Sequence, residues 1–382
     1  MEFQSSFKNI NKKEWNDLTK SNPFLRLEFF QSLEGSNSIG EGTGWHPFPA
    51  TLSHEGKLVG ASPIFLKEHS YGEYVFDWSW AEAYQKYGES YYPKIVSCIP
   101  FTPASGPRIF GLDTSIKKNI VSQIEALASK NKMSSSHILF CDEGEQNAYL
   151  NSKWMLREGV QFKWLNKNYK NFEEFLFQLS HDKRKKIKQE RKKIQDSGLK
   201  IKKIKGSEIS ESDLDFFYAC YCNTYQEHHS HPYLTRIFFS LLRESMPENI
   251  LLILAYEKDI PVAGSFFIYD DKNLYGRYWG SKSFYSGLHF ELSYYQGQEF
   301  CIENKIAAFE GGAQGEHKLA RGFEPFNTFS FHRIFDEKFE YAIKDFLRRE
   351  KSGIDKYTNE LNERAPFKTD FNIYKDGGDG ET

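Results

Sequence analysis

The chain has 382 residues, which is long for one ordinary hydrophobic core and favours two domains. Its formal net charge of -2 argues against wholesale nucleic-acid binding, although a local basic patch is still compatible with it. The sequence opens without a cationic stretch followed by an apolar one, holds no apolar run of membrane-spanning length, and scatters its 5 cysteines, so a cytoplasmic protein with reduced thiols is expected.

The first half of the chain shows the patterns of an α/β fold. Apolar spacing and turn residues predict helices over 12–20, 26–33, 81–87, 113–130, 145–152 and 171–196, the last of them ended by Gly198. Alternating or continuous apolar runs predict strands over 49–52, 58–67, 71–77, 95–99, 138–141 and 160–165.

The segment 274–325 of the second half is the densest in chemically useful residues. Alternation predicts a strand over 274–279, helical spacing predicts a helix over 289–304, and a short strand is expected over 307–309. A strand, a helix and a second strand form a βαβ unit, whose ligands gather at the carboxyl ends of the strands. We therefore expect a site at 279–280 and 311–318.

An internal repeat relates the two halves. The stretch that begins at Glu55 carries V-G-A-S and then Y-G-E-Y, and the stretch that begins at Lys258 carries V-A-G-S and then Y-G-R-Y. This match makes 71–77 the counterpart of 274–279 and predicts two copies of one α/β domain. A chance match between two hairpins is the alternative, because hairpins share turn chemistry.

Long motifs resemble the FemAB-like branch of the Gcn5-related N-acyltransferase (GNAT) superfamily, a group linked to peptidoglycan biosynthesis. The motifs lie at 70–78, 91–108, 183–192, 274–280, 288–296 and 312–325, and they include SYGEYVFDW, LYGRYWG and GAQGEHKLARGFEP. The resemblance implies two tandem GNAT-like domains, each a mixed central sheet flanked by helices. The expected boundaries are 1–168 for the first domain, 169–198 for a basic connecting helix, 199–350 for the second domain and 351–382 for a partly disordered extension.

Acyl transfer to an amine needs a base, donors for an oxyanion and a cradle for the leaving group. The candidate catalytic residues are Glu316 and His317 in the glycine-rich turn, Glu291 behind them, and Asp77 as the counterpart in the first half. The alternative is that the Glu-His-Lys triplet only solvates a loop. The candidate substrate-binding residues are Tyr74, Trp78, Arg108, Arg184, Arg277, Tyr278, Trp279, His289, Tyr295, Gln314, Lys318, Arg321 and Phe323.

The acyl donor is open between acyl-CoA and aminoacyl-tRNA. The stretch from Arg277 to Gly280 begins like the pyrophosphate-binding loop of acetyl-CoA users, but Lys282 stands where that loop has a small residue. The basic run 183–193 can contact phosphates through Arg184, Lys188 and Arg191, which favours tRNA or a nucleotide-linked precursor. A merely solvated helix face is the alternative.

The sequence thus predicts an N-acyltransferase that carries an acyl or aminoacyl group to an amine, with a small molecule or a peptidoglycan precursor as acceptor. No metal site is expected. The alternative function is a non-catalytic peptide- or glycan-binding protein built on the same fold.

Overall fold

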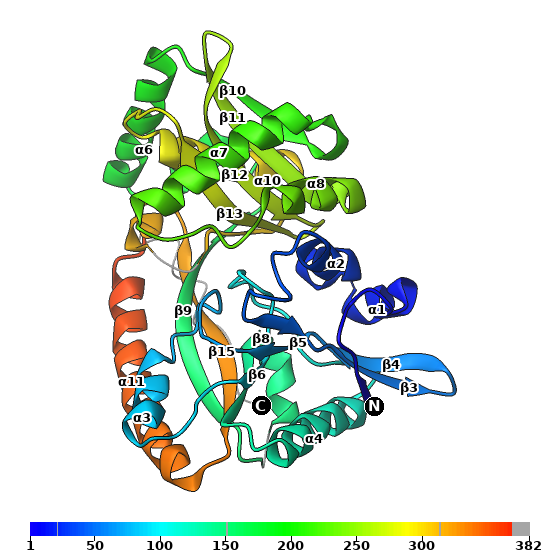
Figure 1. Ribbon diagram of the computed structural model, residues 1–382. Coiled ribbons are helices and arrows are strands. Elements are labelled where there is room, and N and C mark those ends of the chain that lie inside the picture. The colour runs from blue at the N-terminus through cyan, green and yellow to red at the C-terminus, as the bar shows by residue number, and fades with distance from the viewer. Residues whose placement is uncertain (21, 150–151, 313–314, 369–382) are drawn as a thin grey trace, which may run out of the picture. The chain divides into compact units, whose positions relative to one another are not determined.

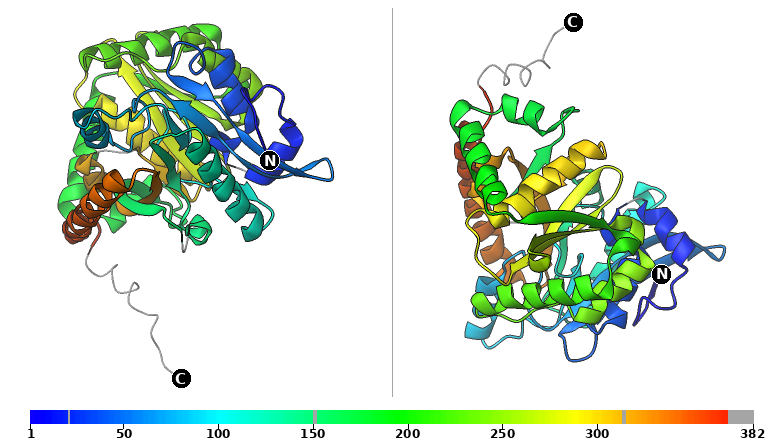
Figure 2. Two further views of the ribbon diagram at one scale, coloured as in Figure 1. Left: turned by 60° about the horizontal axis from the view of Figure 1, so that its bottom comes forward. Right: turned by 90° about the horizontal axis from the view of Figure 1, so that it is seen from above.

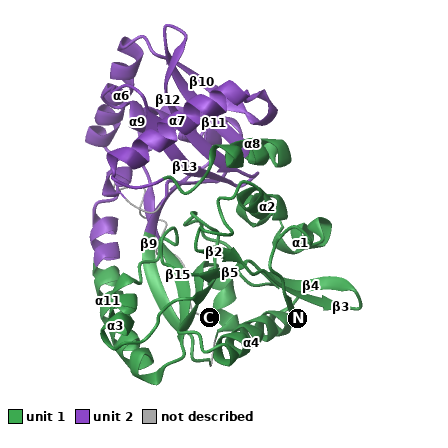
Figure 3. Ribbon diagram, viewed as in Figure 1, with its two compact units in different colours: residues 1–160, 232–249, 327–356 green, residues 161–231, 250–326, 357–382 purple. Residues whose placement is uncertain are grey.

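A computed structural model describes residues 1–20, 22–149, 152–312 and 315–368 (Figure 1). The chain forms two compact units, each assembled from segments that are distant in the sequence (Figure 3). Unit 1 comprises Met1–Val160, Pro232–Asn249 and Asn327–Lys356, and unit 2 comprises Gln161–His231, Ile250–Phe326 and the chain from Tyr357. The sequence-based domain boundaries stay a prediction.

Unit 1 contains two sheets. A small antiparallel sheet has the strand order β1-β3-β4-β7, and the larger sheet has the order β15-β8-β6-β5-β2, in which β6 and β8 are parallel. The strands are β1(Glu2–Phe3), β2(Trp45–Pro47), β3(Ala50–His54), β4(Lys57–Ser62), β5(Ile64–Lys67), β6(Lys94–Ser97), β7(Phe110–Gly111), β8(Ser135–Cys141) and β15(Glu324–Ile334). β8 is buried along its whole length, as expected for a strand covered on both faces.

Helices cover the sheets of unit 1. They are α1(Lys12–Thr19), α2(Leu27–Gly35), α3(Trp78–Lys86), α4(Thr114–Lys130), α8(Arg236–Ser245) and the first part of α11(Glu337–Glu363), with short turns η1(Pro23–Leu25), η2(Glu143–Ala148) and η4(Pro247–Asn249). The teal helix α4 is visible in the left view of Figure 2. It places Ile120, Ile124 and Ala128 in one core with Ile64 and Ile138 of the strands. Their spacing of four residues puts these side chains on one helix face.

Unit 2 is built on one mixed sheet of strand order β10-β11-β12-β13-β14-β9. Its strands are β9(Met155–Leu165), β10(Lys200–Lys205), β11(Ile250–Glu257), β12(Ile260–Tyr269), β13(Asn273–Ser281) and β14(Ala308–Glu310), and the first part of β9 lies in unit 1. Only β13 and β14 pair in parallel within this sheet. This pair forms the expected βαβ unit.

The helices of unit 2 include the connection between β13 and β14. They are α5(Phe172–Gln178), α6(His181–Asp196), α7(Glu211–Glu227), α9(Leu288–Phe290), α10(Gln296–Glu303) and the turns η3(Gly206–Glu208) and η6(Glu316–Arg321). Between α9 and α10 the segment η5(Glu291–Tyr295) is a π-helical turn, so the helix predicted over 289–304 is confirmed with one wider turn inside it. Such turns often occur at functional sites.

The strand predicted over 71–77 is wrong. Gly72 and Tyr74 have positive φ angles of 80° and 60°, so the segment turns instead of extending. The turns bring Glu73 and Asp77 onto the buried ammonium of Lys94, at 2.8 and 2.5 Å. The segment 71–77, which the internal repeat predicted to match β13, is therefore an irregular loop. The two segments are similar in sequence but differ in structure.

The single helix predicted over 171–196 is also wrong. It divides into α5 and α6, because Leu179 and Ser180 adopt extended ψ angles of 154°. Leu179 forms a bridge with Phe367, and the backbone N–H of Ser180 donates to the carbonyl of Pro366 at 2.9 Å. Because the backbone groups of Leu179 and Ser180 pair with the residues that follow α11, they do not continue the helical hydrogen bonding, and the helix is interrupted. Within the described part of the chain, no helix combines the length and apolarity needed to cross a bilayer.

Candidate active site

The candidate site lies in unit 2, where β13 and β14 part. The parallel pairing covers only Asn273–Tyr275 of β13 and Ala308–Glu310 of β14, and β13 then continues to Ser281 paired with β12 but no longer with β14. A cavity of about 100 Å³ occupies this divergence, lined by β12, β13, the helical connection and Gly311. The sequence predicted a site at 279–280 and 311–318. Trp279 from the first stretch and Gly311 from the second both line this cavity.

A bulge shapes the strand beside the cavity. Phe266 of β12 pairs with Tyr278, while Phe267 pairs with Gly276, so Arg277 is an extra residue on β13. A bulge interrupts the ladder and turns a side chain to a new direction. The Arg277 guanidinium lies 5.2 Å from the ring of Tyr278, and both residues line the cavity.

Two uncharged imidazoles and a phenol meet at the cavity. Tyr294 and His289 line it, and the Nε2 atom of His317 lies 3.0 Å from the Tyr294 hydroxyl. Burial, together with His317 and the neighbouring Arg321, lowers the pKa of His289 to about 4. Partial burial, then Lys318 and Arg321, lowers the pKa of His317, whereas burial raises that of Tyr294 to about 12. At neutral pH both imidazoles can accept a proton and the phenol keeps its own.

The turn η6 carries two buried cations that hold it in place. The Lys318 ammonium donates to the carbonyl of Gly312 at 2.9 Å, and burial lowers its pKa to about 8. Arg321 stacks 3.4 Å above the ring of Phe290 and donates from Nη1 to the carbonyl of His317 at 2.7 Å. Phe323 packs against Tyr294, with ring centroids 5.4 Å apart.

The two glutamates predicted as bases are engaged elsewhere. Glu291 accepts two hydrogen bonds from Arg191, at 2.9 and 3.1 Å, and one from Gln296 at 2.7 Å. Glu316 is exposed and accepts from Arg364 at 3.1 Å and from Tyr357 at 3.3 Å. Glu316 and His317 are adjacent in the sequence, but only His317 contacts a residue that lines the cavity.

Four of the predicted residues belong to unit 1. Asp77 forms an ion pair with Lys94 and accepts a hydrogen bond from Tyr91 at 2.6 Å. Burial alone would raise the pKa of Asp77, but Lys94 and His137 hold it well below its usual range. Arg108 is fully buried and donates to the carbonyls of Ala104, Gly106 and Pro107, while Tyr74 and Trp78 lie in and after the 71–77 loop.

The remaining candidates lie on or near α6. Arg184 packs over the ring of Phe177, with 5.8 Å from the guanidinium carbon to the ring centre. The hydroxyl of Tyr295 donates to Glu190 of α6. Gln314 lies outside the described residues.

Sequence reasoning missed Tyr294 and Glu190 as parts of this site, and it predicted Arg191 only as a phosphate ligand. The π turn places Tyr294 toward the cavity, and regular helical spacing gives no indication of such a turn. A signal for Glu190 was present, because it interrupts a run of basic residues. An acidic residue within such a run indicates a cationic partner. In the structure this partner is Arg321.

A family described by its role in peptidoglycan biosynthesis or recognition matches residues 6–369. The chain belongs to the FemAB-like family. Among curated proteins, none matches it.

Solved structures share the fold of this FemAB-like chain. FemX superposes with a TM-score of 0.55 at 11% identity, covering 90% of this chain and 100% of FemX. The C-terminal domain of a protein assigned as a lysylphosphatidylglycerol synthetase from Agrobacterium fabrum has a TM-score of 0.52 at 10% identity, covering 87% and 94%. A conserved protein of unknown function from Bacteroides thetaiotaomicron has a TM-score of 0.53 at 12% identity, covering 87% and 99%. At these identities the likeness concerns the fold alone, and the predicted α/β class is confirmed.

Proposed function

We propose that this protein transfers an acyl or aminoacyl group to an amine in cell-envelope metabolism. The observation that carries the proposal is the meeting of uncharged His289 and His317 with the protonated phenol of Tyr294 where β13 and β14 part. The family's description and the name of the lysylphosphatidylglycerol synthetase relative support the cell envelope as the setting.

In this proposal the imidazoles remove the proton from the attacking amine. An ammonium ion cannot attack a carbonyl carbon, so a neighbouring base raises the fraction of reactive amine. The Tyr294 phenol, which is protonated at neutral pH, gives its proton to the leaving group and takes back the amine proton from the imidazolium of His317, whose Nε2 atom lies 3.0 Å from the hydroxyl. The bulged strand β13, which lines the cavity, provides donors for the developing oxyanion.

An aminoacyl-tRNA is the donor that the proposal favours, with acyl-CoA as the alternative. The cavity of about 100 Å³ accommodates the reacting end of a donor, since whole ligands of drug size need roughly 300 Å³ or more. α6 presents Lys185, Lys186, Lys192 and Lys193 as exposed cations that have no ion-pair partner among the described residues. These four lysines, which we call the outer lysines, suit a phosphate backbone.

The test supplies the protein with aminoacyl-tRNA or acyl-CoA and a peptidoglycan precursor that carries a free amine. Mass spectrometry should detect the acylated precursor with the wild-type chain, and the His289→Asn/His317→Asn variant should lose turnover while it still binds the precursor. A double variant with full turnover would exclude the imidazoles as the base. An absence of product with both donor classes would contradict acyl transfer itself.

One observation favours the alternative, a binding protein without turnover. Glu291 and Glu316, the two carboxylates expected to serve as bases, both accept hydrogen bonds from arginines. Under that alternative the wild-type chain binds a peptide or glycan of the cell envelope and forms no acyl product with either donor.

A further inference from the structure

The helix α6 contributes two oppositely charged neighbours to the candidate site. Glu190 accepts two hydrogen bonds from Arg321, at 2.9 and 3.0 Å, and one from the hydroxyl of Tyr295. Arg191 binds Glu291 and also Glu299, the latter at 2.7 Å. Consecutive helical residues therefore hold the turn η6 on one side and the helical connection on the other.

Arg321 connects Glu190 to the backbone of His317. Its Nη2 atom donates to Glu190, and its Nη1 atom donates to the main-chain carbonyl of His317. The arginine is 2% exposed and is also stacked on Phe290. A buried arginine held by a carboxylate at Nη2, by a carbonyl at Nη1 and by a stacked ring has little rotational freedom, so its position fixes the backbone that carries the imidazole.

We propose that Glu190 is a positioning residue, which sets the place and the proton affinity of the His317 imidazole through Arg321. The inference rests on the proposed function, since it treats His317 as a base. It adds a residue outside the cavity and assigns a role to the single acid of the basic run. It also gives α6 two faces, with the outer lysines toward the solvent and Glu190 toward the turn.

The charges around His317 determine the sign of the effect. Tyr294 and His289 face it from the helical connection, Lys318 and Arg321 from its own turn, and Glu190 from α6 through Arg321. Both nearby cations disfavour the imidazolium. Removing the Glu190 charge leaves the Arg321 guanidinium uncompensated, so His317 should become harder to protonate.

The experiment follows each imidazole by NMR in the full chain labelled at histidine C–H groups, with the His317 signal assigned from His317→Asn. We expect Glu190→Gln to lower the pH at which His317 titrates. Asp196→Asn removes the same charge from an exposed position on α6 and should leave that pH unchanged. An unchanged His317 titration in a folded Glu190→Gln variant overturns the proposal.

Glu190→Asp keeps the test decisive if the glutamine variant does not fold. The aspartate retains the charge but is shorter, so the ion pair weakens and the His317 titration should move in the same direction by less. No movement in this variant overturns the proposal equally. A purely structural role would lower the unfolding temperature without a selective change at His317.

Turnover provides a second readout. Glu190→Gln should reduce kcat about 10-fold to 100-fold, since a displaced base loses alignment, and should leave the KM for the donor within about twofold. A matching rise in KM with unchanged kcat would assign Glu190 to donor binding and overturn the positioning role. The NMR titration needs no substrate, so it decides the Glu190 link even where the wild-type chain shows no turnover and the proposed function fails.

Discussion

At the scale of single residues, the site keeps its proton acceptors uncharged by burying them beside cations. Partial burial, then Lys318 and Arg321, disfavours the imidazolium of His317, and burial does the same for His289. The pKa of a histidine in water is about 6.5, and these effects lower it. The bases therefore stay available in mildly acidic solution.

This arrangement predicts the pH dependence of acyl transfer. The reaction needs the unprotonated base, so kcat/KM should fall on acidification with a midpoint below 6.5, the ordinary histidine value. Arg321→Gln removes a cation and should move this midpoint to higher pH. A steady-state pH profile measures both. A wild-type midpoint above 6.5, or one that His289→Asn and His317→Asn leave in place, would contradict the assignment.

The buried ion cluster of unit 1 predicts a large stability effect. Lys94 is fully buried and binds Glu73, Asp77 and Ser70 at 2.5–2.8 Å. Lys94→Met leaves two carboxylates without their cation and should reduce the free energy of unfolding by about 3–5 kcal/mol. Chemical denaturation measures this loss.

Lys86→Met is the matched control for Lys94→Met. Lys86 is exposed in the last turn of α3 and forms no ion pair among the described residues. The control should change stability by less than about 0.5 kcal/mol. Similar losses in both variants would mean that the cluster does not stabilise unit 1.

Residue types were easier to predict from the sequence than residue roles. Glycines beside charged residues predicted a site in the turn 311–318. One residue of this turn, His317, contacts Tyr294, which lines the cavity. Its neighbour Glu316 instead meets Arg364, which is 48 residues away in the sequence. Such a partner is set by tertiary structure, so local sequence could not separate the two.

At the scale of elements, close packing of β13 on α7 depends on one glycine. A Cβ atom added to Gly280 would lie 2.1 Å from the carbonyl oxygen of Cys220 in α7, which is backbone and cannot rotate away. Gly280→Ala should lower the free energy of unfolding by at least about 1–3 kcal/mol. Gly353→Ala is the control, because nothing lies within 4 Å of its added Cβ and alanine favours the helix α11.

Thermal unfolding of the two variants separates the outcomes. Gly280→Ala should unfold at a lower temperature than the wild-type chain, and Gly353→Ala at the same or a higher temperature. An unaltered unfolding temperature for Gly280→Ala would show that α7 can move away from β13 at little cost. The strand itself was predicted from alternation, whereas this approach of a helix to the strand is a tertiary feature.

The outer lysines of α6 predict a salt-dependent interaction with tRNA. Replacing Lys185, Lys186, Lys192 and Lys193 by Gln should weaken tRNA binding and flatten the slope of log affinity against log salt by about 0.7–0.9 for each phosphate that the helix no longer neutralises. Replacing Lys117, Lys118, Lys130 and Lys132, on and after α4, removes equal charge elsewhere and serves as the control. Equal slopes in the two variants would exclude α6 as the tRNA-binding element.

Arg191 is unsuited to that test, although the sequence predicted it as a phosphate ligand. Its guanidinium binds Glu291 and Glu299, so its replacement would leave buried Glu291 without its cation. Lys188 is paired with Glu173 at 2.6 Å. Helical periodicity placed the apolar stripe of α6 correctly, with Ile187 and Ile194 buried, but it could not show which cations have partners.

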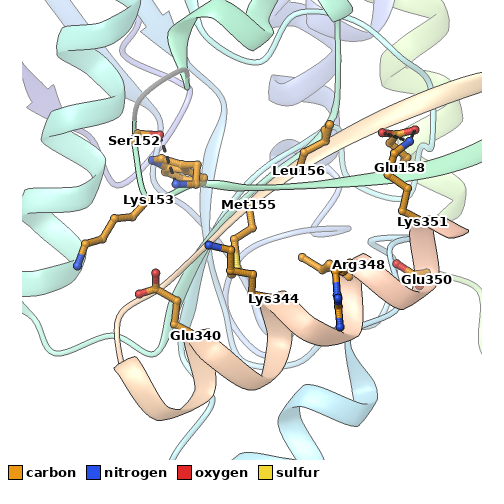
Figure 4. Close-up of a pocket in the computed structure, with 12 residues that line it drawn as sticks. Ser152, Lys153, Met155, Leu156, Glu158, Glu340, Lys344, Arg348, Glu350 and Lys351 are labelled. Carbon is orange, nitrogen blue, oxygen red and sulfur yellow. Dashed lines mark hydrogen bonds and ion pairs between the residues drawn. The ribbon is translucent and has the colours of Figure 1, made fainter.

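A second cavity, of about 440 Å³, lies in unit 1 between the start of β9 and α11. The residues that line it include Met155 and Leu347, and Met155 is labelled in Figure 4. Its acids are engaged, since Glu350 binds Arg157 and Glu158 binds Lys351. Although this cavity is larger than the cavity of unit 2, the cavity of unit 2 is the candidate active site, because two imidazoles and a phenol meet there.

At the scale of the whole molecule, the sequence predicted the fold class, whereas local patterns did not indicate that each compact unit combines distant segments of the chain. Periodicity identified most strands and helices, and long motifs identified the family. Unit 1, however, takes Pro232–Asn249 and Asn327–Lys356 from the second half of the chain. Local patterns contain no information about which distant segment completes a core, because that depends on pairing between elements.

Because unit 1 is assembled from three separate segments of the chain, we predict that residues 1–168 do not fold alone. This fragment lacks β15, which pairs with β8, and α8, which packs on α2 through a contact between Phe238 and Phe29. It also lacks Phe339 of α11, whose ring stacks 3.7 Å from Tyr84. The exposed apolar faces should leave the fragment aggregated or molten, without cooperative unfolding in near-ultraviolet circular dichroism.

A chain that joins the three segments of unit 1 by flexible linkers provides the contrast. It restores β15, α8 and the first part of α11, so it should regain a cooperative transition at a cost set mainly by linker entropy, which grows slowly with linker length. Cooperative unfolding of residues 1–168 by themselves would refute this view and favour a first domain that is contiguous in the sequence. Failure of the joined chain alone would instead show that unit 1 needs unit 2 to fold, because β9 and α11 each continue from one unit into the other.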